Sequence, residues 1–235
     1  MVSALEGTRM YDCNIAIDLE FTPSQVRGAA LKKEIIEIGA VRVPQEGEVL
    51  DTFQTLVKPE YSHDVSRAVH GLTGICAADL VRAPGFADAI SDLAEWVSTD
   101  NVRMVCWDKV DMRQVRNEAS AKDVELPVCL RRWMDLQVVY PRAMHVGRGG
   151  RSKMALSVAA GWCGVDMDER QAHRALYDAR ITAEILASLL SGDYREQRAR
   201  LDTSMAASAG ATSSIGAKYG DKLLELKRRL EAQAA

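Results

Sequence analysis

Three stretches of the sequence decide the fold: CNIAIDLEF at residues 13–21, EIIEIGAVRV at residues 34–43 and TFQTLVK at residues 52–58. Each is rich in β-branched or aromatic residues, which pack well on the pleated surface of a sheet. The turn signal PQEG (44–47) leaves a short connection between the second and third stretches, and Pro59 ends the third. The three stretches are therefore predicted to form an antiparallel meander.

After the meander the pattern changes to alternating helix and strand. The stretch FADAISDLAEWV (86–97) has apolar residues at helical spacing, and VRMVCW (102–107) has the composition of a buried strand. Further helices are predicted at residues 112–120, 154–162 and 176–190, of which the last has the clearest periodicity. A meander followed by alternating helices and strands predicts an α/β fold in which helices flank a mixed sheet.

The composition of the 235 residues is that of a globular protein, with 47% hydrophobic and 27% charged residues. These proportions exclude a wholly disordered chain, a collagen-like fibre and a disulfide-stapled miniprotein. The formal net charge is −3, so the chain as a whole does not attract nucleic acid. A nucleic-acid partner must therefore be held by a local basic patch or by metal ions.

The cysteines and the N-terminus bear on cellular location. The five cysteines include no CxxC pair, which favours reduced thiols in a cytosol-like compartment and argues against a zinc ribbon. Residues 1–13 lack a basic-then-apolar signal sequence, and no apolar run approaches the ~18 residues that span a bilayer. We therefore expect a cytoplasmic protein with no membrane partner.

The chain is expected to consist of one domain and a C-terminal appendage. Residues 1–192 form the predicted domain, residues 193–217 a flexible linker, and residues 218–235 a short amphipathic helix. Such a short helix is marginal alone in water. It either docks on its own domain or frays, or it binds a partner or a second copy of the chain in a homodimer.

Two carboxylates, Asp18 and Glu20, follow the apolar residues of the first strand. Residues two apart on a strand point to the same face, so both side chains project together. The spacing alone is common among 33 acidic residues, and a strand end that simply enters solvent is the alternative. Carboxylates at the end of a buried strand need a partner, however, and a hard divalent cation is the natural one.

Further candidate residues flank two of the predicted helices. His173 precedes the clearest helix and Asp178 lies in its first turn, while Asp108 and Asp111 follow the buried strand. Histidine exchanges protons near neutral pH, although capping of a helix explains residues at such positions equally well. Clustered carboxylates repel one another, and the simplest neutraliser is a pair of magnesium or manganese ions shared with a substrate phosphate.

Three motifs together resemble those of the DEDDh superfamily, also called DnaQ-like 3′–5′ exonucleases. They are DLEFT (18–22), WDKVD (107–111) and HRALYDARITAEIL (173–186), in the order and spacing of that superfamily. The resemblance covers roughly residues 12–191. DLEFT and the stretch HGLTG (70–74) are most similar to the Eri-type and sporulation-inhibitor-type branch. The resemblance implies a ribonuclease H-like fold, which agrees with the mixed α/β sheet predicted from the strand patterns.

The resemblance also implies a site. Asp18, Glu20, Asp111 and Asp178 match the four metal-binding acids, and His173 matches the general base. The implied cofactors are two ions of Mg²⁺ or Mn²⁺. Asp18, Glu20 and Asp178 would hold one of them, and Asp18 and Asp111 would hold the other.

Two positions depart from the pattern of the superfamily. Asp108 stands where glycine is frequent and is a second candidate acid, but the spacing from Trp107 favours Asp111. Tyr177 stands where an acidic residue is common, immediately before Asp178, and is expected to stack or pack locally.

The activity implied by the resemblance is hydrolysis of the terminal phosphodiester at a free 3′ end, which releases nucleoside 5′-monophosphates. The resemblance to the Eri-type and sporulation-inhibitor-type branch implies that the nucleic-acid partner is RNA rather than DNA. One alternative is a DNA exonuclease of the proofreading or repair type. Another is a catalytically idle nucleic-acid-binding module, against which the retention of all four acids and the histidine argues.

Two groups of residues are candidates for substrate binding. Leu19 and Phe21 alternate with the acids of the first strand, and they either pack in the core or contact the terminal nucleotide. Arg148, Arg151 and Lys153 lie in a glycine-containing loop without acidic residues. Such a loop either steers a phosphate backbone or is simply solvated.

Overall fold

The computed structural model describes residues 11–28, 30–44, 51–144, 154–168 and 171–194, together with residues 196, 197 and 199. The chain as far as Tyr194 forms one compact unit. Of the predicted linker (193–217), the described residues 194, 196, 197 and 199 are helical, and its remainder lies outside the described residues. The predicted helix (218–235) also lies outside them, so both assignments stay predictions.

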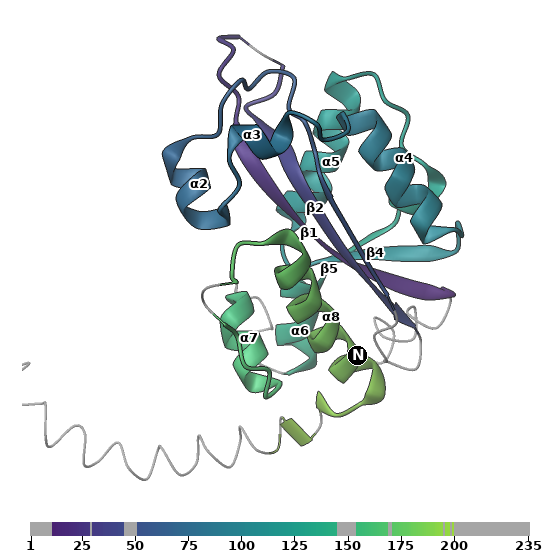
Figure 1. The fold of residues 1–235 in the computed structure, drawn as a ribbon. Coiled ribbons are helices and arrows are strands. Elements are labelled where there is room, and N and C mark those ends of the chain that lie inside the picture. The colour runs from purple at the N-terminus through teal and green to yellow at the C-terminus, as the bar shows by residue number, and fades with distance from the viewer. Residues whose placement is uncertain are drawn as a thin grey trace, which may run out of the picture. The chain divides into compact units, whose positions relative to one another are not determined.

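A mixed sheet of five strands forms the centre of this unit, in the order β3-β2-β1-β4-β5 (Figure 1). The strands are β1 (Cys13–Pro23), β2 (Lys33–Pro44), β3 (Thr52–Leu56), β4 (Val102–Cys106) and β5 (Trp133–Asp135). β1 and β3 both pair antiparallel with β2, whereas β4 pairs parallel with β1 and with β5. The predicted meander and the predicted α/β fold with a mixed sheet are therefore confirmed.

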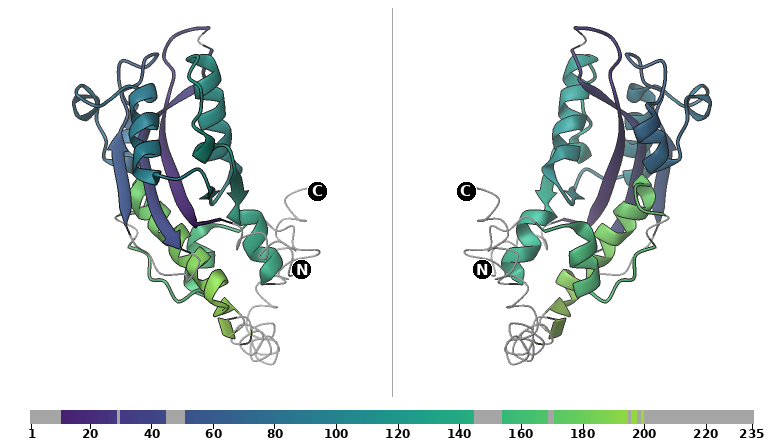
Figure 2. Two further views of the ribbon diagram at one scale, coloured as in Figure 1. Left: turned by 90° about the vertical axis from the view of Figure 1, so that its right-hand side faces the viewer. Right: turned by 90° about the vertical axis from the view of Figure 1, so that its left-hand side faces the viewer.

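Helices cover both faces of the sheet. They are α2 (Arg67–Thr73), α3 (Ala77–Leu80), α4 (Phe86–Val97), α5 (Lys109–Ala121), the 3₁₀ helix η2 (Val128–Leu130), α6 (Leu136–Ala143), α7 (Leu156–Trp162) and α8 (Ala175–Ser191). α5 and α8 lie on opposite sides of the sheet (Figure 2). α6 and α7 lie beside α8 (Figure 1).

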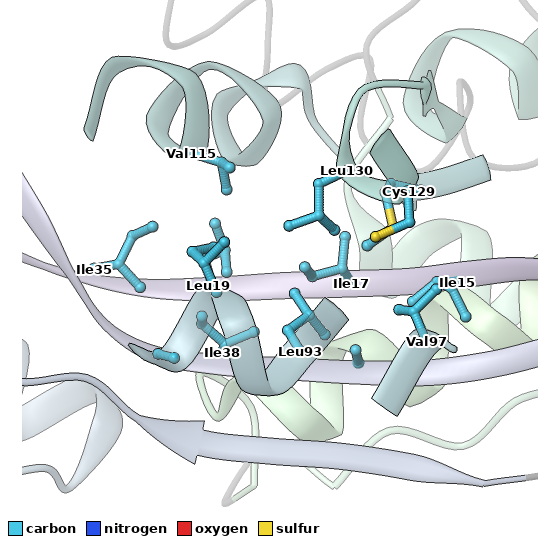
Figure 3. Close-up of a cluster of buried hydrophobic side chains, with 14 of the residues drawn as sticks. Ile15, Ile17, Leu19, Ile35, Ile38, Leu93, Val97, Val115, Cys129 and Leu130 are labelled. Carbon is cyan, nitrogen blue, oxygen red and sulfur yellow. The ribbon is translucent and has the colours of Figure 1, made fainter. Parts of the chain in front are cut away.

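The alternation of side chains along β1 separates an apolar face from an acidic one. Ile15, Ile17 and Leu19 belong to the core under α4 and α5 and are almost fully buried. Figure 3 shows them among side chains of these helices, including Leu93 and Val115. Burial of such a strand face is the main driving force for its packing, at about 25 cal/mol per Å² of apolar surface. The intervening residues of β1 face the side covered by α8.

Five elements were not predicted from periodicity: α2, α3, η2, β5 and α6. They are only three to eight residues long, and a periodic pattern cannot develop over so few positions. α6 also contains Pro141, which weakens the sequence signal for a helix. The helix predicted at 112–120 begins earlier, at Lys109, because Asp108 caps it.

Within the described ranges, no helix combines the length and the apolar character that crossing a membrane requires.

Candidate active site

Asp18 and Glu20 share one face of the sheet with two positions of β2. In the antiparallel register, Asp18 lies opposite Gly39 and Glu20 lies opposite Glu37. The register shifts between Glu20 and Phe21, directly after the two acids. Such irregularities bend a strand and redirect its side chains, and they are frequent next to active sites.

α8 approaches this face closely because β2 has a glycine at position 39. A Cβ atom at Gly39 would overlap the backbone of Ala175 and Leu176, the first residues of α8. Only a residue without a side chain permits this contact. It brings the first turn of α8, which contains Asp178, to the acids of β1.

His173 precedes α8 and reaches the same place. The ligand atoms of Glu20, His173 and Asp178 all lie within 4.8 Å of one another. The backbone of His173 has a φ of +66°, a left-handed conformation that is uncommon for residues other than glycine. Its N–H donates a hydrogen bond of 3.1 Å to Asp178 Oδ2. The Asp178 carboxylate therefore stabilises the turn from which the exposed histidine projects.

The two acids near the start of α5 have different surroundings. Asp108 is the N-cap residue, and its carboxylate accepts a hydrogen bond of 3.2 Å from the Val110 N–H. Asp111 lies in the first turn, is 6% exposed, and raises the pKa of Asp18 through its charge. The structure thus brings Asp111 to the acids of β1, in agreement with the choice made from spacing.

Burial raises the pKa of all four acids, and the charges of the other acids add to the shift at Asp18 and Glu20. Desolvation, followed by the charges of Asp111 and Asp178, raises the pKa of Asp18 well above its ordinary value. Desolvation and then the charge of Asp178 raise the pKa of Glu20 from 4.5 to about 8. Desolvation likewise raises the pKa of Asp111 to about 8, although the charge of Lys33 opposes the shift. Desolvation also raises the pKa of Asp178, against the hydrogen bond that it accepts.

This donor set fits a divalent cation. Several half-buried or buried carboxylates at one place are unfavourable unless positive charge is added. Hard cations of the Mg²⁺ class bind oxygen ligands of this kind. The four acids supply such oxygens, and the imidazole of His173 lies beside them.

A comparison with protein families identifies the chain. The model of the RNase_T family, described as exonuclease, matches residues 15–186. The chain belongs to this exonuclease family. The match contains all three motifs, from Asp18 in the first to Asp178 in the third.

Individual relatives of the exonuclease family are similar over most of this chain. The 3′-5′ exoribonuclease 1 of Rattus norvegicus is 27% identical over 190 residues, which cover 77% of this chain and 53% of that protein. Subunit epsilon of DNA polymerase III from Aquifex aeolicus is 30% identical over 180 residues, which cover 75% of this chain and 79% of that protein. The chain thus spans about half the length of the exoribonucleases that it matches.

A solved structure shares the fold. The nuclease domain of 3′hExo, a DEDDh family member bound to rAMP, superposes with a TM-score of 0.68 at 24% identity. The match covers 77% of this chain and 93% of that one. Together with the family match, this confirms the ribonuclease H-like fold and the resemblance to DEDDh exonucleases.

The predicted substrate-binding residues are distributed differently. Leu19 is 3% exposed and its side chain packs in the core, so only its backbone is available to a nucleotide. Phe21 is half-buried, and Lys33 Nζ lies 3.5 Å from the centroid of its ring. Arg148, Arg151 and Lys153 lie outside the described residues.

Sequence reasoning missed three charged residues around the site: Lys33, Glu37 and Arg174. Lys33 acts on Asp111 through its charge, and Glu37 forms an ion pair with Arg174. A signal for Glu37 exists, since it stands among the apolar residues of EIIEIGAV, two positions before Gly39 and therefore on the same strand face. No signal in the sequence identifies Arg174 as the ion-pair partner of Glu37.

Tyr177, which departs from the superfamily pattern, packs locally as expected. Its hydroxyl oxygen accepts a hydrogen bond of 2.6 Å from the Asp168 N–H. This contact ties the start of α8 to the segment that precedes it.

Proposed function

We propose that this exonuclease-family chain hydrolyses the terminal phosphodiester bond at the 3′ end of a nucleic acid and releases nucleoside 5′-monophosphates. The observation that carries the proposal is that possible metal-ligand atoms of Glu20, His173 and Asp178 lie within 4.8 Å of one another. Asp18 is close enough to these acids that the charges of Asp111, Asp178 and Glu20 raise its pKa. Carboxylates that need a cation, beside an exposed histidine, provide what two-metal phosphodiester hydrolysis requires.

The proposed cofactors are two ions of Mg²⁺ or Mn²⁺. Asp18, Glu20 and Asp178 would hold one ion, and Asp18 and Asp111 would hold the second. When bound, the ions stabilise negative charge on the phosphate and lower the pKa of the attacking water. The raised pKa values of these acids support the assignment, because the cations would restore their ionised forms.

His173 is the proposed general base, which accepts the proton of the attacking water. Its side chain is exposed, so water and substrate reach it. Its backbone is held by Asp178, which limits the directions in which the ring can point. General-base catalysis by a positioned side chain typically contributes 10²–10⁴-fold to the rate, so we expect a loss of about that size in His173→Ala.

RNA is the proposed substrate class. The support comes from the relatives: the rat protein is named an exoribonuclease, and the nuclease domain with the same fold is bound to rAMP, a ribonucleotide. RNA and DNA differ at the 2′-hydroxyl, and a protein distinguishes them through contacts to that group.

A DNA exonuclease is the second candidate. Its support is the epsilon subunit of DNA polymerase III, a relative matched over 79% of its own length. The two candidates make opposite predictions for matched substrates.

The test uses the full chain with 5′-labelled single-stranded RNA and DNA of the same sequence, in magnesium or manganese. Asp178→Asn and a chelator are the controls. A ladder that shortens from the 3′ end, faster on RNA and absent in both controls, supports the first candidate. Faster trimming of DNA supports the second. No cleavage of either by the folded protein would contradict both and favour a binding module.

Phe21 and the basic loop are proposed to contact the substrate. Phe21 presents a half-buried aromatic ring next to Lys33, at the end of the strand that carries the acids. Replacing Arg148, Arg151 and Lys153 by glutamine should weaken RNA binding and reduce its dependence on salt concentration. Unchanged binding across a salt titration would contradict a role for the loop.

We further propose a cytoplasmic location and a C-terminal helix (218–235) that mediates dimerisation or binds a partner. All five cysteines are unpaired, which is typical of proteins in a reducing compartment. Sedimentation of the full chain and of a chain ending at Tyr194 would show whether the C-terminal residues change the oligomeric state.

A further inference from the structure

Glu37 is a fully buried carboxylate whose two oxygens are both occupied by donors. Oε1 accepts hydrogen bonds from Arg174 Nη2 at 2.7 Å and from Gln54 Nε2 at 2.7 Å. Oε2 accepts a hydrogen bond of 3.1 Å from the Ala175 N–H, and Arg174 Nε lies 3.2 Å from each oxygen. A carboxylate offers about four acceptor positions, and these contacts use them.

This environment gives Glu37 a different role from Glu20, its partner on the adjacent strand. Glu20 and Glu37 lie directly opposite each other in the register of β1 and β2. A carboxylate oxygen of Glu20 lies within 4.8 Å of possible metal-ligand atoms of His173 and Asp178. The oxygens of Glu37 instead accept hydrogen bonds from protein donors. Glu37 therefore binds the protein rather than a cation.

The donors bound by Glu37 lie at the beginning of α8. Ala175 is the first residue of the helix and Arg174 is its N-cap, but the Arg174 side chain does not cap the helix. The first N–H groups of a helix lack partners within the helix, and a carboxylate at this end is favoured by the helix dipole. A residue of β2 thus supplies the cap that the local sequence of α8 lacks.

Two carboxylates hold the chain at His173 and directly after it. The His173 N–H donates to Asp178 Oδ2. Glu37 holds the next two residues, Arg174 and Ala175. The left-handed turn at His173 is a costly conformation and persists only where its surroundings fix it.

We infer that Glu37 is a positioning residue for His173: it binds the Arg174 side chain and the Ala175 N–H to β2 and thereby sets where the imidazole lies. The inference rests on the proposed function, in which His173 is the general base. Glu37 is the buried member of the ion pair, with a side chain that is 0% exposed, whereas the Arg174 side chain is 44% exposed. A displacement of about 1 Å at a catalytic group can reduce the rate by about 10²-fold.

The test compares Glu37→Gln with the wild-type chain. Glutamine keeps the size of the side chain, but its NH₂ group replaces one carboxylate oxygen. A hydrogen-bond donor then faces the N–H donors of Arg174, Ala175 or Gln54. We expect kcat to fall by about 10–100-fold while KM changes by less than about 3-fold, because substrate contacts are not removed. Arg174→Gln breaks the same ion pair by changing its exposed member. We expect a smaller loss of kcat, about 3–10-fold, because Glu37 still binds the Ala175 N–H.

Arg42→Gln is the matched control. Arg42 also lies on β2 and also anchors a helix, through hydrogen bonds to Trp96 O at 2.6 Å and Val97 O at 3.2 Å at the end of α4. We expect it to lower the melting temperature while leaving kcat within about 2-fold of wild type, because α4 carries none of the proposed catalytic groups.

Two further measurements separate positioning from general damage. In a His173→Ala background, Glu37→Gln should lower the residual kcat by less than about 3-fold, because residues that act as a unit are not additive. In the metal-free protein, hydrogen exchange at the Ala175 amide should become faster in Glu37→Gln and remain slow in Arg42→Gln.

The outcomes are distinct. A wild-type kcat in Glu37→Gln, an equal loss of kcat in Arg42→Gln, or a full additional loss in the His173→Ala background would each overturn the inference. If the wild-type chain degrades neither RNA nor DNA, the proposed function fails, and exchange at Ala175 then reports only whether Glu37 holds the start of α8.

Discussion

Replacing Glu20 by glutamine should stabilise the metal-free protein at alkaline pH, although it removes a proposed metal ligand. The pKa of Glu20 is raised from 4.5 to about 8 by burial and by the charge of Asp178. A carboxyl group with a raised pKa in the folded state stabilises the fold fully only below its unfolded pKa, and that contribution is lost as the pH rises to the folded value. Metal-free protein should therefore lose stability between about pH 4.5 and pH 8.

The size of the effect follows from the shift. Each pKa unit corresponds to about 1.4 kcal/mol, so the shift of Glu20 corresponds to at most about 5 kcal/mol. Asp18 and Asp111 carry related shifts from the same cluster, so the three contributions are not additive. We expect Glu20→Gln to gain about 2 kcal/mol at pH 8.5, which corresponds to about 4–8 °C in melting temperature for a domain of this size.

The assay is thermal unfolding from pH 5 to pH 9, with a chelator or with Mn²⁺. A cation that binds only the folded state at 100 times its Kd adds about 2.7 kcal/mol to the stability of the wild-type chain. Glu20→Gln should gain much less from Mn²⁺. Glu125→Gln is the control, because the Glu125 side chain is 90% exposed and its replacement should leave both curves unchanged.

Two results would refute the reasoning. One is a metal-free wild-type protein whose melting temperature does not fall between pH 6 and pH 8.5. The other is a Glu20→Gln variant that is less stable than wild type in chelator at pH 8.5, since that would mean that Glu20 is ionised at no cost in the folded state.

Three further predictions concern the site and its supports. Asp178→Asn should lower the exonuclease rate in Mg²⁺ by about 10³-fold or more while the chain stays folded by circular dichroism, and activity within about 10-fold of wild type would contradict its role. Lys122→Met should lower the free energy of unfolding by about 3–5 kcal/mol in urea titrations, because it leaves Glu34 and Glu118 buried without the cation that lies 3.1 and 2.9 Å from them. An unchanged midpoint would show that the ion pairs of Lys122 do not stabilise the fold. Gly39→Ala should lower both stability and activity, since its Cβ atom would displace the start of α8, and a wild-type melting curve would show that α8 can shift without cost.

Much of the fold could be predicted because its signals are local. The strands at 13–21 and 34–43 and the helix at 86–97 follow from the spacing of apolar residues, which depends only on near neighbours along the chain. α3 and β5 could not be predicted in this way, because β5 is three residues long and is a strand only through its pairing with β4.

In the site, too, the sequence indicated what depends on near neighbours, and the structure was needed for the rest. The two-residue spacing of Asp18 and Glu20 indicated a shared strand face, and the structure shows both on the face that α8 covers. Spacing favoured Asp111 over Asp108, but only the structure shows that Asp108 caps α5 while Asp111 is buried near the other acids.

The sequence by itself determined which residues are the candidates for the chemistry: acids at the end of an apolar strand, and a histidine and an acid at the start of a helix. Only the tertiary structure decided how they are held. Glu37 and Arg174 are 137 positions apart, and their ion pair depends on α8 packing against β2 at Gly39. Periodicity is a property of neighbouring residues, whereas the partner of a buried charge depends on strand order and on which helix covers which face.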